Sequence, residues 1–264
     1  GVVVSARRRR SRGHRLAAAS ANVARVRDRC LDAWRPRFEA GLDGGEYCII
    51  WLGEEFPGNQ MRDDQGSITF DSPELTEDMD VVGQPMLELS FSVDKPVAHI
   101  AVRLNDVWPT GEVSRITYHL QNLCMRESRE YPTPLEPGKR YKMKIKMDDI
   151  AWRVPKGHKL RVSISTSYFP MMWPAPEPVK LTVHAGASTI AVPVRKRNLT
   201  DKPVVFANPE AAAPVQQKQI KKASNSRKTW IDKKTGHTKM AIVDDFGTQE
   251  LKPHGMIVSG VGRE

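Results

Sequence analysis

The sequence predicts an all-β protein whose body is an antiparallel jelly-roll β-sandwich, with a short N-terminal helix and irregular basic tails. The first observation is alternation: every second residue of Met86–Val93 is apolar, and in Tyr141–Met147 apolar residues alternate with three lysines. One apolar face and one wet face are typical of antiparallel sheets. The second observation is that Pro- and Gly-rich turns separate such runs, with no helical pattern between them, as in sandwiches and jelly rolls.

The individual elements follow from the same patterns. An amphipathic helix is expected between Ala19 and Ala33, where apolar residues recur at three- and four-residue steps, and Pro36 ends it. A C-terminal hairpin is expected around a turn at Asp244–Gly247. Strands are expected at Ser67–Phe70, Met86–Val93, His99–Asp106, Ser114–Leu123, Tyr141–Met147, Leu160–Ser165, Leu181–His184 and Thr189–Val194.

These elements divide the chain into five expected regions. The regions are a basic Arg/Ala-rich leader that is helical or disordered (1–40), a loop segment that leads into the sandwich (41–65), the jelly-roll sandwich (66–197), a flexible basic linker (198–238) and a hairpin-like C-terminal extension (239–264). The linker is assigned from its Ala, Gln, Lys and Ser content, which is typical of solvated segments.

The charge is concentrated in the flanking segments. The 264 residues carry a formal net charge of +10, but residues 1–40 contain eleven arginines against three acidic residues, and residues 211–239 contain eight basic residues against Asp232. The remaining body is slightly acidic. A basic patch on a folded face, which specific nucleic-acid binding would need, is therefore not indicated, and only nonspecific binding by the tails remains open.

Cysteine content and hydropathy indicate the compartment. Cys30, Cys48 and Cys124 are scattered and odd in number, which argues against a disulfide framework and favours the cytoplasm. The longest apolar runs, such as Tyr47–Leu52, are far shorter than the roughly 20 residues of a membrane span. No membrane association is expected.

Catalytic and metal-binding motifs are absent from the sequence. It contains no G-x-S-x-G elbow, phosphate-binding glycine loop, C-x-x-C or H-E-x-x-H motif. The acidic pairs, of which Asp63-Asp64 is the first, are expected at turns, where Asp bonds its own backbone. His158, in a Lys-Gly-His turn, is expected to be structural. The sequence therefore predicts no catalytic residue, no metal site and no cofactor.

Three blocks of the sequence resemble a known family. They are Ile68–Asp78 followed by Val82–Pro85, Arg103–Gly111, and Val154–Ser165, within a resemblance that runs from about Glu46 to Val194. The family is the C-terminal jelly-roll domain of the X-Pro dipeptidyl-peptidase and cocaine-esterase-like (CocE/NonD) serine hydrolases. The resemblance implies an accessory domain that caps the active site of an α/β-hydrolase domain cleaving amide or ester bonds. In that family the Ser–Asp–His triad lies in the preceding domain, so no catalytic position is carried over to this sequence.

The resemblance also implies a partner and a contact surface. The partner is an α/β-hydrolase catalytic domain, separately encoded or lost, and the oligomeric state stays open. In the family the segment around Tyr47–Asp64 lies over the catalytic domain, so Trp51, Leu52 and Phe56 are the candidates for contacting substrate or partner domain. Two alternatives stay open: a free-standing carbohydrate-type binding module that uses loop aromatics, and nonspecific nucleic-acid binding by the basic tails.

Overall fold

The computed structural model describes residues 3–5, 29–31, 40–47, 55–196, 202, 204–232, 234–235 and 238–263. The chain divides into two compact units. The first unit contains residues 1–48 and 56–197, and the second contains residues 49–55 and 198–264. No helix in the described part of the chain is long and apolar enough to cross a membrane.

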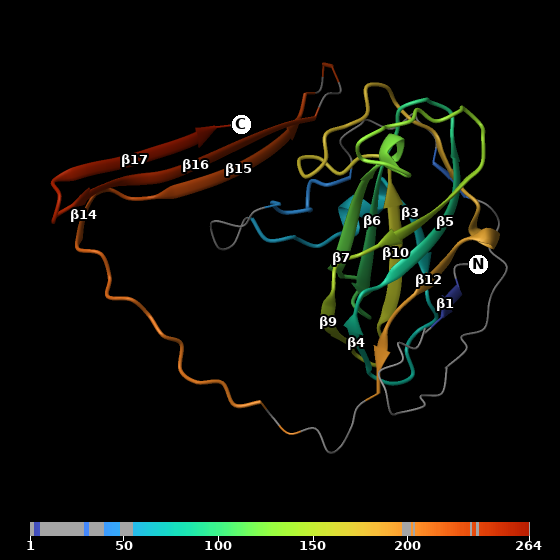
Figure 1. The fold of residues 1–264 in the computed structure, drawn as a ribbon, viewed down its shortest axis with the longest axis horizontal. Helices are drawn as coiled ribbons and strands as arrows, with labels where there is room; N and C mark the ends of the chain where they lie inside the picture. Colours follow the sequence, from blue (N-terminus) through green and yellow to red (C-terminus); the bar gives the residue numbers. More distant parts are fainter. Residues whose placement is uncertain are drawn as a thin grey trace. The chain divides into compact units, whose positions relative to one another are not determined.

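The described strands of the first unit form three sheets (Figure 1). The six-stranded sheet has the order β1 (Val3–Ser5), β12 (Thr189–Ala191), β5 (Met86–Val93), β11 (Leu181–Val183) and β2 (Arg29–Leu31), with β8 (Tyr141–Lys146) also paired to β5. The four-stranded sheet has the order β3 (Ile68–Asp71), β10 (Lys159–Ser165), β6 (His99–Val107) and β7 (Val113–Asn122). The third sheet has the order β13 (Val194–Arg195), β4 (Met79–Gly83) and β9 (Ile150–Val154).

Short helices lie between some of these strands in the sequence. They are α1 (Met61–Gln65), the 3-10 turn η1 (Leu123–Met125) and the 3-10 turn η2 (Ala185–Ala187). Among the described pairings of the first unit, only β1 with β12 is parallel. The predicted class, an antiparallel all-β sandwich, is confirmed.

The hydrophobic core lies between the six-stranded and four-stranded sheets. β5 directs Leu87, Leu89 and Phe91 into it, and β6 contributes Ile100 and Leu104 from the facing layer. All five side chains are completely or almost completely buried. The alternation that predicted these strands follows from this geometry, because successive side chains of a strand point to opposite faces.

Some elements differ from the sequence-based expectation. β4 and β9, which pair with each other, were not expected, because Met79–Gly83 and Ile150–Val154 show little alternation. Arg29–Leu31, inside the range expected to be helical, forms β2 instead and pairs with β11. The rest of the expected N-terminal helix lies outside the described residues.

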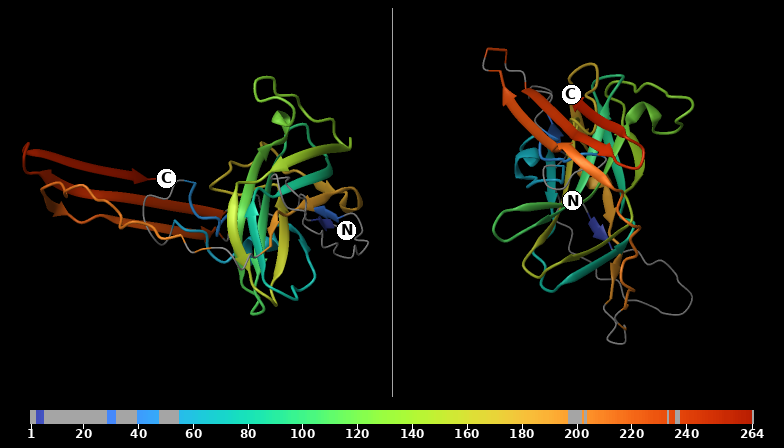
Figure 2. Two further views of the ribbon diagram at one scale, coloured as in Figure 1. Left: turned by 60° about the horizontal axis from the view of Figure 1, so that its bottom comes forward. Right: turned by 90° about the vertical axis from the view of Figure 1, so that its left-hand side faces the viewer.

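The second unit contains a separate antiparallel sheet. β16 (Thr238–Leu251) pairs along one edge with β14 (Gln217–Lys221) and β15 (Ser224–Ile231), and along the other with β17 (Met256–Arg263) (Figures 1 and 2). Two of these strands lie in the range expected to be a linker. Their polar sequences lack the alternation that reveals a half-buried strand.

The turn expected at Asp244–Gly247 is wrong, because β16 continues through these residues. The register shifts between Asp245 and Thr248, which marks a β-bulge. Gly247 has a φ of 73°, a conformation that favours glycine, and Asp245 Oδ1 accepts a 2.8 Å hydrogen bond from its N–H. The aspartate and the glycine of this segment therefore mark a bulge, and the turn lies between β16 and β17.

Candidate functional site: a buried polar network on the four-stranded sheet

The face of the four-stranded sheet that points away from the core is polar but not exposed. Arg103, Asn105 and Ser163 project from it, and all three are fully buried. Residues 40–47 and 56–67, called here the covering segment, supply many of the groups that bond to this face. A buried polar face needs a partner for nearly every donor and acceptor, so the covering segment is held by specific contacts.

Arg103, in the middle of β6, is the centre of these contacts. Its Nη1 donates to Gln60 Oε1 at 3.1 Å, and its Nη2 donates to Ser67 Oγ at 2.6 Å. Nη2 also lies 3.1 Å from Asp64 Oδ1. Such charge-assisted bonds allow a guanidinium to be buried, and they fix the covering segment to the sheet.

The Asp64 carboxylate extends the network to the neighbouring strand. Ser163 Oγ donates to Asp64 Oδ1 at 2.7 Å, and Arg161 Nη1 donates to Asp64 Oδ2 at 3.0 Å. Arg161 also forms a bidentate pair with Asp71 on β3, at 2.6 and 2.7 Å. Asp64 therefore bridges β6 and β10 from above the sheet.

Gln60 connects the covering segment to the loop after β10. Its Oε1 accepts from the Tyr168 hydroxyl at 2.9 Å, and its Nε2 donates to the carbonyl oxygens of Asp43 at 2.6 Å and Gly58 at 2.9 Å. Arg115 Nη1 in turn donates to the Tyr168 hydroxyl at 2.8 Å. Segments more than 100 residues apart are thus joined through one amide side chain.

Asp63 is the carboxyl group beside this network whose pKa is raised into the mildly acidic range. It is fully buried in α1. Burial raises the pKa of its carboxyl to about 6, and the Arg103 guanidinium and the backbone N–H groups of Gly41 and Asp43 only partly offset this increase. The pKa of this carboxyl therefore lies well above its ordinary value, and the side chain changes charge in the mildly acidic range.

Gly41 allows the covering segment to approach the loop after β10 closely. Its φ is 111°, and a Cβ atom at this position would collide with the backbone of Tyr168 and Phe169. Only glycine combines this conformation with so close a backbone contact.

Several aromatic side chains beside this network face solvent. Phe56 is 48% exposed, Tyr47 is 81% exposed and Trp173 is 75% exposed. Trp173 packs edge-on against Phe169, with the ring centroids 5.6 Å apart. Of the three contact candidates from the sequence, Phe56 is thus exposed on the covering segment, while Trp51 and Leu52 lie outside the described residues.

His158 is paired with an aspartate elsewhere in the first unit. Its Nδ1 lies 2.7 Å from Asp106 Oδ1, and Trp152 Nε1 donates to the other oxygen at 3.4 Å. The Trp108 ring lies 5.2 Å from the imidazole. An acid and a histidine are two members of a hydrolase triad, but no hydroxyl or thiol bonds to this ring within the described residues. The pair instead joins β6 to the turn before β10.

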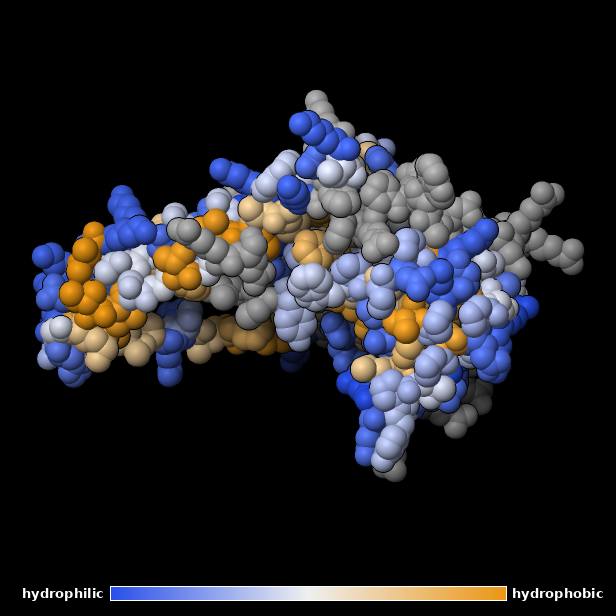
Figure 3. Space-filling view, turned by 90° about the horizontal axis from the view of Figure 1, so that it is seen from above, coloured by the Kyte–Doolittle hydropathy of each residue, from blue (hydrophilic) through white to orange (hydrophobic). Residues whose placement is uncertain are grey.

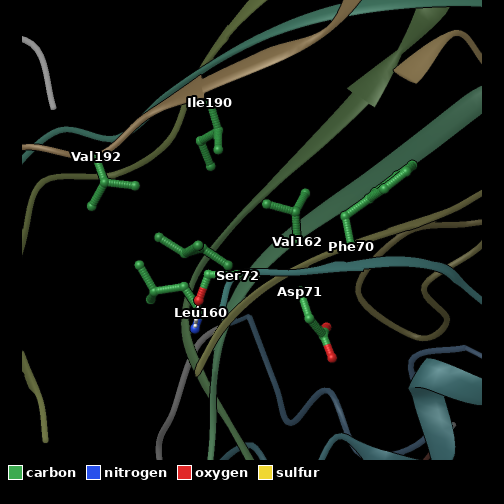
Figure 4. A pocket seen from close by; sticks show the side chains of 8 residues that line it. Phe70, Asp71, Ser72, Leu160, Val162, Ile190 and Val192 are labelled. Carbon is green, nitrogen blue, oxygen red and sulfur yellow. Dashed lines mark hydrogen bonds between the residues drawn. The ribbon is translucent and has the colours of Figure 1, made fainter. Parts of the chain in front are cut away.

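A small pocket lies between residues of the four-stranded sheet and residues in and beside β12 of the six-stranded sheet (Figure 4). Its lining consists of Phe70, Asp71, Ser72, Leu104, Leu160, Val162, Ile190 and Val192. The cavity volume is about 10 Å³, room for about one water molecule. Its two polar side chains are already engaged, Asp71 by Arg161 and Ser72 Oγ by the N–H of Leu160 at 3.0 Å. The pocket is too small for a sugar or a peptide side chain.

Acidic, histidine and cysteine side chains do not gather into a metal site in the described ranges, where no group of three could hold an ion. A two-layer antiparallel sandwich, stabilised on its outer face by a polar network, defines a structural β-domain.

A family profile identifies which β-domain this is. The profile of the X-Pro dipeptidyl-peptidase C-terminal non-catalytic domain matches residues 10–211. The chain therefore belongs to this family of non-catalytic hydrolase domains, and the resemblance of the sequence blocks is confirmed.

Individual relatives agree with the family. The chain is 28% identical over 138 residues to a protein of Rhodopirellula baltica described as an Xaa-Pro dipeptidyl-peptidase, a match that covers 48% of this chain and 21% of the relative. It is 26% identical over 128 residues to the cocaine esterase of Rhodococcus sp. strain MB1 Bresler, covering 48% of this chain and 22% of the esterase. The matches thus span about a fifth of each relative, and full-length relatives contain a catalytic partner domain.

A solved structure supports the fold. An aminopeptidase from the marine sediment archaeon Thaumarchaeota archaeon superimposes with a TM-score of 0.55 and 19% sequence identity. The superposition covers 67% of this chain and 34% of the aminopeptidase. At this identity the similarity concerns the sandwich itself.

Sequence reasoning missed most of the polar network. Asp63 and Asp64 were expected at a turn that satisfies them locally, but both lie in α1. Asp64 bonds to groups on the sheet, and Asp63 accepts from the backbone N–H of Asp43 in the covering segment. One signal was available: Arg103 interrupts the otherwise apolar segment Ile100–Leu104, and a charge inside a strand of this kind requires a partner.

Proposed function

We propose that this domain caps the active site of a serine-hydrolase catalytic domain that cleaves amide or ester bonds. Its family membership supports the accessory role, and the names of its relatives support the two bond types. Acyl transfer needs a nucleophile, an oriented base and oxyanion donors in one place. The catalytic domain supplies all three in this proposal.

The proposed contact surface is centred on the covering segment. Phe56 is the described member, and Trp51 and Leu52 are proposed to extend it toward substrate or partner domain. Exposed aromatic side chains favour this surface, because interface cores are enriched in them. The loop bearing Trp173 lies beside the covering segment at Gly41, which provides a second aromatic contact.

The buried network supports the same role by making the cap rigid. A wall of an active site must hold its position to within a fraction of an ångström, and surrounding hydrogen bonds provide that stiffness. Arg103 and Gln60 fix both ends of α1, so Phe56 leads into a segment whose backbone is held at several points.

The proposed setting is the cytoplasm, without a membrane or a specific nucleic-acid partner. The uneven cysteine count supports a reducing compartment, and Cys124, which the structure describes, is free and buried. The location of positive charge in the tails supports a body that does not read nucleic acid.

Enzyme complementation tests the proposal. The chain alone should neither hydrolyse p-nitrophenyl esters or X-Pro anilides nor react with a fluorophosphonate probe. Adding the Rhodopirellula relative, produced without its C-terminal domain, should raise that protein's activity, and Phe56→Ala in this chain should weaken the effect. Stoichiometric fluorophosphonate labelling of the chain itself would contradict a non-catalytic role.

A further inference from the structure

The outer edge of β17 differs chemically from the other sheet edges whose side chains the structure describes. In the described part of the chain β17 pairs only with β16, so the backbone N–H and C=O groups on its other side have no strand partner. Such an edge is a template for another strand. Met256, Ile257, Val258 and Val261 are each about half exposed or more, and because neighbours in a strand alternate, both faces of β17 carry exposed apolar surface.

Most of the other edge strands carry charge that discourages strand addition. β8 presents Lys142, Lys144 and Lys146 in a row, and all three are exposed. β3, β7, β9, β13, β14 and β15 each contain at least one charged residue, whereas β17 contains one only at its last position, Arg263. Charged side chains on an edge strand are a known protection against pairing between molecules. The segment from Met256 to Gly262 has neither a charge nor a proline.

The sequence of β17 also fits a second copy of itself. When two identical antiparallel strands are related by a twofold axis perpendicular to the sheet, an odd-numbered residue faces an odd-numbered residue and an even-numbered residue faces an even-numbered one. An axis centred on Ser259 pairs the whole uncharged segment with its copy. Ile257 of each copy then lies opposite Val261 of the other. The other face brings Val258 opposite Gly260 and Met256 opposite Gly262, large residues against residues without side chains.

We propose that β17 is a self-association edge, through which two copies of this chain form a continuous antiparallel sheet centred on Ser259. The occupant is a second copy because its edge supplies matching backbone groups, apolar pairs on one face and uncrowded pairs on the other. The interface is independent of any hydrolase partner.

Light scattering after size-exclusion chromatography, from about 5 to 200 µM chain, measures the association. The parent chain, with a mass of 29.7 kDa, should approach twice that mass as concentration rises. Ser259→Lys places two like charges opposite each other at the axis and should raise the midpoint concentration of association by about two- to fivefold. Ser259 is exposed, so the substitution leaves the packing of the unit intact.

Two further samples keep the proposal falsifiable. An equimolar mixture of Ser259→Lys and Ser259→Glu chains should regain the dimer, because opposite charges then meet at the axis. Thr229→Lys, an exposed position on β15, should associate like the parent. A parent chain that stays monomeric up to the highest concentration overturns the proposal, and so does a Ser259→Lys chain that dimerises as readily as the parent.

Discussion

In the first unit two sheets meet face to face, and Leu89, Phe91 and Ile100 are completely buried between them. In the second unit a single sheet carries Trp230, Ile257 and Val258 with about half of each side chain or more in contact with solvent. Hydrophobic residues, in orange, are visible on the surface in Figure 3. Apart from the β1–β12 pair, the described strands of both units pair antiparallel, and both units contain many β-branched residues. Strand pairing alone therefore does not make a core, because an apolar face is removed from water only when a second layer covers it.

The first unit also uses polar residues differently. Its outer face is closed by the covering segment through Arg103, Asp64 and Gln60, whereas the charged residues of the second unit lie mainly on exposed strands. Charges that are buried and paired contribute large energies when one partner is removed, and exposed charges contribute little.

The largest effect is expected for Arg103→Ala. Removing the guanidinium leaves the buried Asp63 carboxyl without its cation and Asp64 with Arg161 alone, at a cost of about 3–5 kcal/mol in the free energy of unfolding. Arg153→Ala removes an exposed pair with Asp80 and should cost no more than about 1 kcal/mol. Urea denaturation of both variants measures the difference, and equal losses would show that the network does not carry the stability of this face.

A comparison of apolar positions in the two units comes next. Leu89→Ala should lower the free energy of unfolding by about 2–5 kcal/mol, because it opens a cavity between the sheets. Val258→Ala, at a position that is half exposed, should change it by no more than about 0.5 kcal/mol. Denaturation at low protein concentration avoids any contribution from association. A loss above about 2 kcal/mol at Val258 would mean that a second layer covers β17.

Asp63 gives the first unit a specific dependence on pH. Its folded-state pKa of about 6 lies above the ordinary 3.8, so between these values the folded chain holds a proton that the unfolded chain has lost. This stabilising contribution is complete below pH 4 and is lost as pH rises through 6. At pH 8 the Asp63→Asn variant, which has no carboxyl to ionise, should therefore exceed the parent in free energy of unfolding by up to about 3 kcal/mol. This difference should become smaller as the pH is lowered.

The comparison between parent and Asp63→Asn isolates this carboxyl from the other acidic residues, which titrate in both proteins. Thermal unfolding at intervals between pH 4 and pH 8 measures it. A difference that does not change with pH would mean that Asp63 titrates normally.

The smallest effect is expected at Phe56. Because the side chain is about half exposed, Phe56→Ala should change the free energy of unfolding by about 0.5 kcal/mol or less. Binding to a hydrolase catalytic domain should weaken instead, as measured by titration calorimetry. A destabilisation near 3 kcal/mol with unchanged binding would place Phe56 in the core.

The sequence was sufficient to predict the strands whose two faces differ in polarity. β5 and β8 were found at their observed positions because Leu89 and Ile145 are buried while Lys144 is exposed. β15 was missed because its Ser, Asn, Arg and Lys residues resemble a solvated linker, and only pairing with β16 makes it a strand. The network was missed because Gln60 and Tyr168 are 108 residues apart, a distance that no local pattern crosses.

Gln60 also limits how this domain can change over generations. Its amide uses two acceptor and two donor contacts, with Arg103 and Tyr168 on the oxygen and the carbonyl groups of Asp43 and Gly58 on the nitrogen. Glutamate and lysine codons each differ from a glutamine codon by one nucleotide, and both side chains are similar in length to glutamine. A glutamate here would place a carboxylate oxygen against the two carbonyl oxygens, and a lysine would place an ammonium group against the two donors. A residue that is freely exchanged on most protein surfaces is therefore the one at which single-base changes should be purged here.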